Sequence, residues 1–210
     1  MAERPEATEL EALVGRISAC QICSVCPSGR PLPHAPRPVL RVSRTARLAI
    51  AGQAPGARVH RSGIPFADPS GVRLRAWMGV TEDEFYDQHR IAILPMGFCF
   101  PGLDAKGGDL PPRRECAPAW RDDLLQAMPQ IELILAIGQY AQWWHLQGKR
   151  RPVTEVVRGV VNGCVTVGCR RVLALPHPSW RNSGWLKANP WFEQAVVPQL
   201  QREVRRLIVS

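Results

Sequence analysis

Two short segments carry the side chains best suited to chemistry at a leaving group. Gly52-Gln-Ala-Pro-Gly56 follows one apolar run directly, and His177-Pro-Ser179 follows another after one residue. Glycine and proline open a tight turn to close approach, so its backbone N–H groups can hold an oxygen atom or a water. His177 can donate a hydrogen bond to an oxygen that gains negative charge, a common catalytic device. The alternative is an ordinary surface histidine in a rigid loop.

The loop after the first segment supplies a carboxylate and an aromatic ring. Asp68 could orient or activate a water, with Gln53 as a supporting contact. The competing interpretation is that Asp68 caps the helix that begins near Gly71, because Asp is a favoured N-cap residue. Phe66 could stack on a base, which is worth roughly 1–3 kcal/mol, or lie in the core as most phenylalanines do.

The elements expected to position these residues alternate between strands and helices. Apolar runs predict strands, and amphipathic stretches predict helices. The strands are 48–52, 91–94, 131–137 and 171–175, and the helices are 6–20, 72–78, 113–128, one starting at 138, and 190–209. This order predicts an α/β fold, with a four-stranded parallel sheet and helices on both faces. Active sites in such sheets lie beyond the carboxyl ends of the strands. The loops starting at Gly52, Pro95 and Pro176 all leave at that edge.

Composition supports one globular domain over residues 1–210. The chain is 45% hydrophobic, too apolar for a disordered protein, yet it has no apolar run that could span a bilayer. The first twenty residues do not form a secretory signal, so we expect a cytoplasmic protein, a monomer without membrane contact. Lys and Arg exceed Asp and Glu by nine (27 against 18). That excess favours a polyanionic partner.

The segments, taken in order, resemble the uracil-DNA glycosylase superfamily. Gly52–Gly56 is similar to its first motif and His177–Ser179 to its second. Ser62–Phe66 and Asp68–Gly71 resemble the segment that supplies a base-stacking aromatic, and Ala136–Ala141 resembles a strand-to-helix turn. The resemblance covers about residues 20–205. It implies a monofunctional DNA-repair enzyme that flips uracil or another deaminated base from DNA and hydrolyses its N-glycosidic bond, leaving an abasic site.

The resemblance also implies roles for individual residues. The catalytic residues would be Asp68, His177 and Gln53, and the substrate contacts would be Gly52, Ala54, Gly56, Phe66, Phe98 and Ser179. Trp180, Arg181 and Asn182 resemble a loop of single-strand-selective uracil glycosylases that enters the duplex, although Trp180 could instead pack on the sheet edge. Related enzymes often carry an Asn after the second strand, where this chain has Pro95-Met-Gly-Phe98. Uracil, hypoxanthine and xanthine therefore all remain candidate bases.

Seven cysteines form a second group of interest. An odd number in a reducing compartment argues against a disulfide framework. Cys20, Cys23, Cys99 and Cys116 match the four ligands of the iron–sulfur members (families 4 and 5), which implies a [4Fe–4S] cluster that ties residues 1–45 to the sheet. Three alternatives stay open: Cys23 and Cys26 as the first pair, a zinc ion on the same thiolates, or buried apolar cysteines.

Other functions on the same fold are also compatible with the sequence. A non-catalytic or covalently trapping uracil-DNA binder is the main alternative, but the branch that traps carries an inserted basic loop, of which Val59-His-Arg61 is only a faint counterpart. A nucleotide-binding protein that shares only the α/β frame is a third possibility. The pocket loops offer no obvious lysine nucleophile, so we expect no strand cleavage through a Schiff base.

Overall fold

A five-stranded sheet forms the centre of the molecule. The computed structural model describes residues 8–147, 151–160 and 164–209. The strands are β1 (Leu48–Ala51), β2 (Ile91–Ile93), β3 (Leu133–Ile137), β4 (Val165–Val167) and β5 (Arg170–Leu175), in the spatial order β2-β1-β3-β5-β4. The four predicted strands are confirmed, and they pair in parallel: Ile50 lies opposite Ile93 on one side and Leu135 on the other.

The fifth strand was not predicted from the sequence. β4 runs antiparallel to β5, with Val167 opposite Arg170 across a two-residue turn. Gly168 adopts a φ of 60° there, which suits a tight hairpin. The strand is short and exposed, so it lacks the continuous apolar run that marks the four buried strands.

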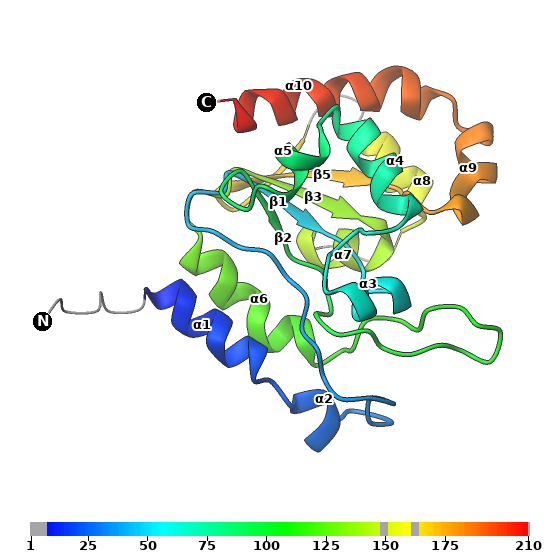
Figure 1. Cartoon of the computed structure of the whole chain (residues 1–210). Helices are drawn as coiled ribbons and strands as arrows, with labels where there is room; N and C mark the ends of the chain where they lie inside the picture. Colours follow the sequence, from blue (N-terminus) through cyan, green and yellow to red (C-terminus); the bar gives the residue numbers. More distant parts are fainter. Residues whose placement is uncertain (1–7, 148–150, 161–163, 210) are drawn as a thin grey trace, which may run out of the picture.

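Helices cover both faces of the sheet, and alternate residues of each strand point to opposite sides. Leu48 and Ile50 belong to one core cluster, whereas Ala49 and Ala51 belong to the other. The first cluster packs under α4 (Pro69–Met78), α5 (Glu82–Tyr86), α8 (Val153–Gly159), the π-helical turn η2 (Phe192–Val196) and α10 (Val197–Ile208). The second packs over α1 (Glu9–Ser18), α6 (Cys116–Ala127) and α7 (Gly138–His145). Figure 1 shows α10 and α4 above the sheet and α1 and α6 below it.

Capping residues mark the ends of the longer helices. Thr8 and Glu11 form a capping box that starts α1. Gly79, in the left-handed region, ends α4. The predicted terminal helix is confirmed, although its first part is the π turn η2. The short helices α2 (Ile22–Val25), α3 (Ala57–Ser62) and α9 (Ser183–Ala188), and the 3-10 turn η1 (Trp180–Asn182), lie in the connecting loops.

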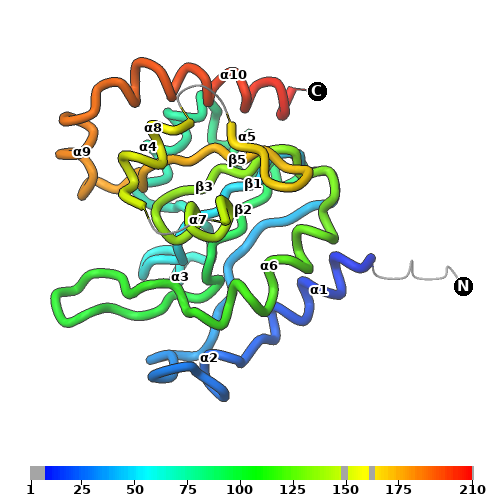
Figure 2. The backbone as a smooth tube through the Cα atoms, turned by 180° about the vertical axis from the view of Figure 1, so that it is seen from behind, coloured from blue at the N-terminus to red at the C-terminus, as the bar shows by residue number. Residues whose placement is uncertain are grey.

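The Pro-rich amino-terminal segment runs back to the sheet edge. Arg41 and Ile93 exchange two backbone hydrogen bonds of 3.0 and 2.8 Å, and the Val39 N–H donates to the Phe98 carbonyl at 2.8 Å. Figure 2, viewed from behind, follows this segment from α2 up to the sheet. The segment pairs with the outer side of β2 and so covers part of an exposed edge. Among the described residues, no helix has the length and apolarity needed to cross a membrane.

Candidate functional site

A pocket lies beyond the carboxyl ends of the parallel strands, as the topology predicts. We call it the edge pocket; it has a volume of about 80 Å³. Three loops form it, and they follow β1, β2 and β5. Its lining residues are Val39, Gly52, Gln53, Ala54, Pro55, Gly56, Val59, Pro65, Phe66, Asp68, Ser70, Ile93, Pro95, Asp109 and His177. None of these lining residues is a lysine.

The ring of Phe66 lies against the turn that begins at Gly52. A Cβ on residue 52 would come within 3.2 Å of Phe66 Cζ, so glycine lets the ring approach the turn. Phe66 adopts a φ of 56°, a conformation that side chains other than glycine rarely take. The Phe66 carbonyl would lie only 1.9 Å from a Cβ on Gly71. Phe66 also packs edge-on against Phe85 in the core, so it combines its two predicted positions, core contact and pocket wall.

His177 is held in a form that can donate from Nε2. The Ser179 N–H donates to His177 Nδ1 at 3.3 Å, and Asn182 Nδ2 donates to the His177 carbonyl at 2.7 Å. An Nδ1 that accepts a hydrogen bond leaves the proton of a neutral imidazole on Nε2. Burial lowers the pKa of His177, although Asp68 and Asp109 oppose that shift. The ring is therefore a neutral hydrogen-bond donor near pH 7.

Asp68 caps α4, which confirms the structural interpretation of this residue. Its Oδ1 accepts from the Ser70 N–H at 2.8 Å, from the Gly71 N–H at 3.2 Å and from the Ser70 hydroxyl at 2.5 Å. All three bonds use the same oxygen, and Asp68 also lines the edge pocket. The cap thus fixes the carboxylate without using Oδ2 in these bonds.

Asp109 is a second carboxylate in the edge pocket, and sequence reasoning did not single it out. A Cβ on Gly56 would come within 3.2 Å of Asp109 Oδ2, which places the carboxylate against the glycine turn. Partial burial raises the pKa of Asp109, and the charge of Asp68 raises it further, while Arg181 and His177 lower it. The only sequence signal was its position in the loop that starts at Pro95.

Of three further predicted residues, Gln53 and Ala54 line the edge pocket, whereas Ser179 does not. Gln53 Nε2 lies 3.4 Å from the Leu110 carbonyl, and the Gln53 carbonyl accepts from the Gly97 N–H at 3.0 Å. Ala54 lines the pocket directly. Ser179 lies behind His177, where its carbonyl accepts from Arg73 at 2.9 Å.

Phe98 does not lie in the edge pocket, although the resemblance implied a substrate contact there. Its side chain is 2% exposed and lies in a different cavity, beside Cys99 and Cys116. Phe98 follows Pro95 by only three residues, but the chain has by then turned away from the pocket. Pro95 itself lines the pocket, but its carbonyl accepts a hydrogen bond from the buried Arg121.

The turn η1 projects from the rim of the edge pocket. The side chain of Trp180 is 73% exposed, which excludes packing on the sheet edge. The Arg181 guanidinium lies 5.8 Å from the centre of the Trp180 ring, a cation–π distance.

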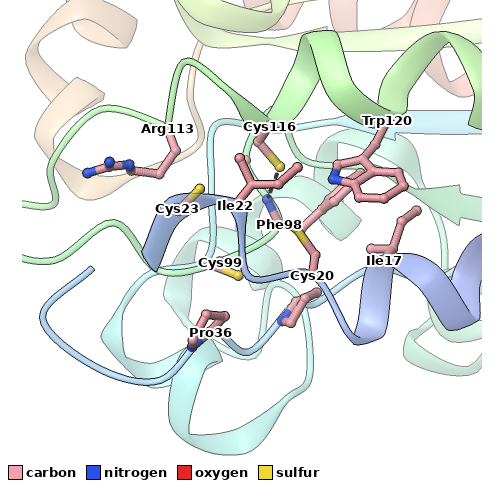
Figure 3. A pocket seen from close by; sticks show the side chains of 12 residues that line it. Ile17, Cys20, Ile22, Cys23, Pro36, Phe98, Cys99, Arg113, Cys116 and Trp120 are labelled. Carbon is pink, nitrogen blue, oxygen red and sulfur yellow. Dashed lines mark hydrogen bonds between the residues drawn. The ribbon is translucent and has the colours of Figure 1, made fainter. Parts of the chain in front are cut away.

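The four predicted cysteine ligands line one small cavity, which we call the cysteine corner: Cys20, Cys23, Cys99 and Cys116. They come from the segment that joins α1 to α2, from α2 itself, from the loop after β2 and from the first residue of α6. Figure 3 shows them around a common space, with a hydrogen bond of 3.3 Å from the Phe98 N–H to Cys116 Sγ. Cys26 is exposed and lies outside this cavity, so Cys20 and Cys23 are the better first pair.

Burial shapes the chemistry of these thiols. Burial, with a smaller contribution from the neighbouring thiols, raises the pKa of Cys99 to about 11 and that of Cys116 to about 12. Among the described residues, no three His, Cys, Asp or Glu side chains gather closely enough to hold a single metal ion.

A buried positive charge lies next to the cysteine corner. Arg121 is 1% exposed and donates to the carbonyls of Leu94 and Pro95 and to His145 Nε2. Burial lowers the pKa of Arg121 to about 10, although the electrostatic effect of Cys116 opposes this shift. Burial also holds the pKa of His145 well below its usual range, with the Arg121 charge adding to the effect.

The basic residues at the other end of the sheet are engaged with acids. Arg171 pairs with Glu203 at 2.8 Å, Arg205 with Glu84 at 2.6 Å and Arg206 with Glu132 at 3.2 Å. Arg171 is the second residue of β5, so it lies near the amino end of the strand, away from the edge pocket. These cations do not form part of the candidate site.

Two comparisons relate the chain to known proteins. The solution NMR structure of a candidate uracil DNA glycosylase from Methanosarcina acetivorans is similar over 76% of this chain and 94% of that chain, with 17% identity and a TM-score of 0.43. The family model described as the uracil DNA glycosylase superfamily matches residues 41–201, which include all three pocket loops. The chain belongs to the uracil DNA glycosylase superfamily.

Proposed function

We propose that the protein is a monofunctional DNA glycosylase that hydrolyses the N-glycosidic bond of uracil, or of another deaminated base, flipped out of DNA. Membership in the superfamily implies a DNA substrate, and the net charge of +9 favours a polyanion. One observation carries the proposal: the Gly52–Gly56 turn, the Phe66 ring and His177 line the same pocket. A flat base needs a stacking surface, backbone donors and a donor for its oxygen, and these three elements supply them.

His177 would act on the base as it leaves. When the bond to the sugar breaks, its electron pair moves onto the base and charge builds on an oxygen of the ring. The neutral His177 can donate from Nε2 to that oxygen, because the Ser179 N–H occupies Nδ1. A fixed donor of this kind contributes about 10²–10³-fold to a rate. The short backbone of the Gly52–Gly56 turn would hold the base in place beside Phe66.

Asp68 would orient the attacking water. The cap bonds of Oδ1 hold the carboxylate at the pocket wall, and Oδ2 is the oxygen that would face the water. Gln53, anchored at both its side chain and its carbonyl, would support this side of the pocket. The cap and the catalytic role are compatible, because they use different oxygens of one group.

Trp180 and Arg181 would enter the space that the flipped base vacates. Flipping costs a few kcal/mol of lost stacking and pairing, which a side chain inserted into the gap can partly restore. The exposure of Trp180 supports this role.

The cysteine corner would hold a [4Fe–4S] cluster, as in the iron–sulfur members of the superfamily. Four thiols that line one cavity and the buried charge of Arg121 support it. Each thiolate of such a cluster binds a different iron, so the sulfurs need not gather around one centre as they would for zinc. When bound, the cluster would cross-link α2, the loop after β2 and α6, a structural role rather than a step in the reaction.

The test is base release from defined DNA. Purified protein is incubated with end-labelled oligonucleotides carrying uracil, hypoxanthine or xanthine, and abasic sites are then cleaved with alkali. Alkali-dependent cleavage at the modified position supports the proposal and identifies the base. Strand breaks without alkali would contradict the monofunctional mechanism. Tight binding to uracil-DNA without release would identify a binding protein instead.

A further inference from the structure

Asp109 is placed by a hairpin whose tip is held by its own hydrogen bonds. Leu103 and Asp109 form an antiparallel bridge, and Asp104 Oδ1 accepts from the N–H groups of Lys106 and Gly108, both at 2.8 Å. The Leu110 N–H donates to the Gly102 carbonyl at 3.0 Å. Figure 1 shows this loop extending from the body of the molecule beside α3. Asp109 lies at the base of the hairpin, where the chain returns to the edge pocket.

The carboxylate of Asp109 faces the reactive part of the pocket. Its Oδ2 would lie 3.2 Å from a Cβ on residue 56, so a side chain at that position would press against it. Asp109 interacts electrostatically with both Asp68 and His177. The carboxylate is partly buried, but the residue as a whole keeps solvent-exposed surface, so water can reach it before DNA closes the pocket.

We propose that Asp109 is a catalytic residue, the group that accepts the proton of the attacking water. The inference rests on the proposed function and assigns to it a carboxylate that lies outside both motifs of the resemblance. It separates two tasks: Asp68, fixed by the helix cap, orients the water, and Asp109 takes its proton.

The step balances as a hydrolysis. The water oxygen forms a bond to C1′ of the sugar, and the bond from C1′ to the base nitrogen breaks with its electron pair leaving on the base. The water proton moves to the Asp109 carboxylate and then passes to the released base or to solvent. No metal, oxidant or further reactant is needed.

The direction of the pKa shift of Asp109 is suited to this role. Partial burial and Asp68 raise its pKa, and a carboxylate with a raised pKa is a stronger base as long as it remains ionised. Bound DNA would cover the pocket mouth and strengthen the burial effect.

The experiment compares three variants by single-turnover base release at saturating protein. Asp109→Asn keeps the size of the side chain and removes the base, and we expect release to slow by about 10²–10⁴-fold with DNA affinity unchanged. Asp109→Glu keeps the carboxylate and should recover part of the rate. Asp104→Asn is the matched control, because it changes a carboxyl on the same hairpin that does not line the pocket. The wild-type rate should fall at acid pH as Asp109 becomes protonated, and this fall should be weaker in Asp109→Asn.

The possible outcomes separate this inference from the proposed function. Wild-type release combined with an unchanged rate in Asp109→Asn would overturn the inference alone. An equal loss in Asp104→Asn would also overturn it, because the hairpin rather than the carboxylate would then be responsible. Wild-type protein that releases no base from any of the DNAs would overturn the proposed function and the inference together.

Discussion

The edge pocket and the cysteine corner share one loop but are built in opposite ways. The chain from Pro95 to Cys116 enters the edge pocket at Pro95, passes through the cysteine corner at Phe98 and Cys99, returns at Asp109 and ends in the corner at Cys116. The edge pocket has a volume of about 80 Å³ and the corner only about 20 Å³. The edge pocket leaves functional atoms available, whereas in the corner Cys23 and Cys116 are buried and Cys20 and Cys99 are partly buried.

This difference indicates that the two sites suit different ligands, an exchanging substrate in the edge pocket and a retained cofactor in the corner. A pocket that exchanges substrate needs open access. It also needs groups in which a hydrogen bond to one atom orients a second atom that stays available. The helix cap orients Asp68 in this way, and the Ser179 N–H orients His177. A site that keeps a cofactor needs the reverse, with donors enclosed by hydrophobic neighbours such as Ile17 and Trp120. We therefore expect substitutions in the edge pocket to affect rate, and substitutions in the corner to affect stability.

Among the variants that contrast the two sites, the largest effect is expected for His177→Ala. Loss of the donor to the leaving base should slow single-turnover release by about 10²–10³-fold, measured with uracil-DNA and alkali cleavage. DNA affinity and thermal stability should remain close to wild type. Ser179→Ala is the control: the backbone N–H that orients His177 is retained, so its rate should be near normal. A similar loss in both variants would show that the loop, rather than the imidazole, matters.

Removal of a corner thiol should change the stability of the protein. Cys116→Ser is expected to abolish the brown colour and the absorbance near 400 nm of a cluster, and to lower the melting temperature, because α6 would lose its link to α2. Cys26→Ser is the matched control, since Cys26 is exposed and lies outside the corner. A colourless wild-type protein that carries zinc and is fully active would refute the cluster.

Substitutions of the two pocket carboxylates, Asp68 and Asp109, should affect the stability of the protein in different ways. Asp68→Ala removes the cap of α4 and should cost about 0.5–2 kcal/mol of unfolding free energy, whereas Asp68→Asn, which can still cap, should cost far less. Denaturant unfolding of the two variants measures the difference. Equal losses would show that the cap bonds do not contribute to stability.

Asp109→Asn should shift stability in the opposite direction. The pKa of Asp109 is raised in the folded protein, so the folded state binds its proton more tightly than the unfolded chain does. Ionised Asp109 therefore costs stability above its folded pKa, and this cost disappears as the pH falls below that value toward the unfolded pKa. At pH 7 the melting temperature of Asp109→Asn should equal or exceed that of wild type, and the gain should vanish at acid pH.

The smallest effect is expected at the rim. Trp180→Ala should reduce release from double-stranded DNA by only a few fold, because the inserted ring restores part of the few kcal/mol spent on flipping. Single-stranded DNA, which needs no unpairing, should be affected less, and comparison of the two rates measures this. A larger loss on single strands would assign Trp180 to the substrate pocket instead.

The sequence revealed the frame of the fold more readily than the contents of the site. Buried parallel strands are continuous apolar runs, and their loops must meet at one edge, so the positions of Gly52 and His177 could be predicted. β4 was missed because an exposed edge strand has no such run. Asp109 was missed because a hairpin returns it to the pocket from the middle of a long loop, and Phe98 was misplaced because the chain turns within three residues of Pro95.

The central claim is that the edge pocket performs the chemistry and the cysteine corner maintains the structure. The most direct test is single-turnover release from uracil-DNA by wild type, His177→Ala and Cys116→Ser, with melting temperature and absorbance recorded on the same samples. We predict that His177→Ala releases base more slowly but keeps the wild-type melting temperature and absorbance. The folded fraction of Cys116→Ser should keep the wild-type rate, while its melting temperature and absorbance change. Absence of release by wild type, or loss of rate in folded Cys116→Ser with a normal rate in His177→Ala, would contradict the account.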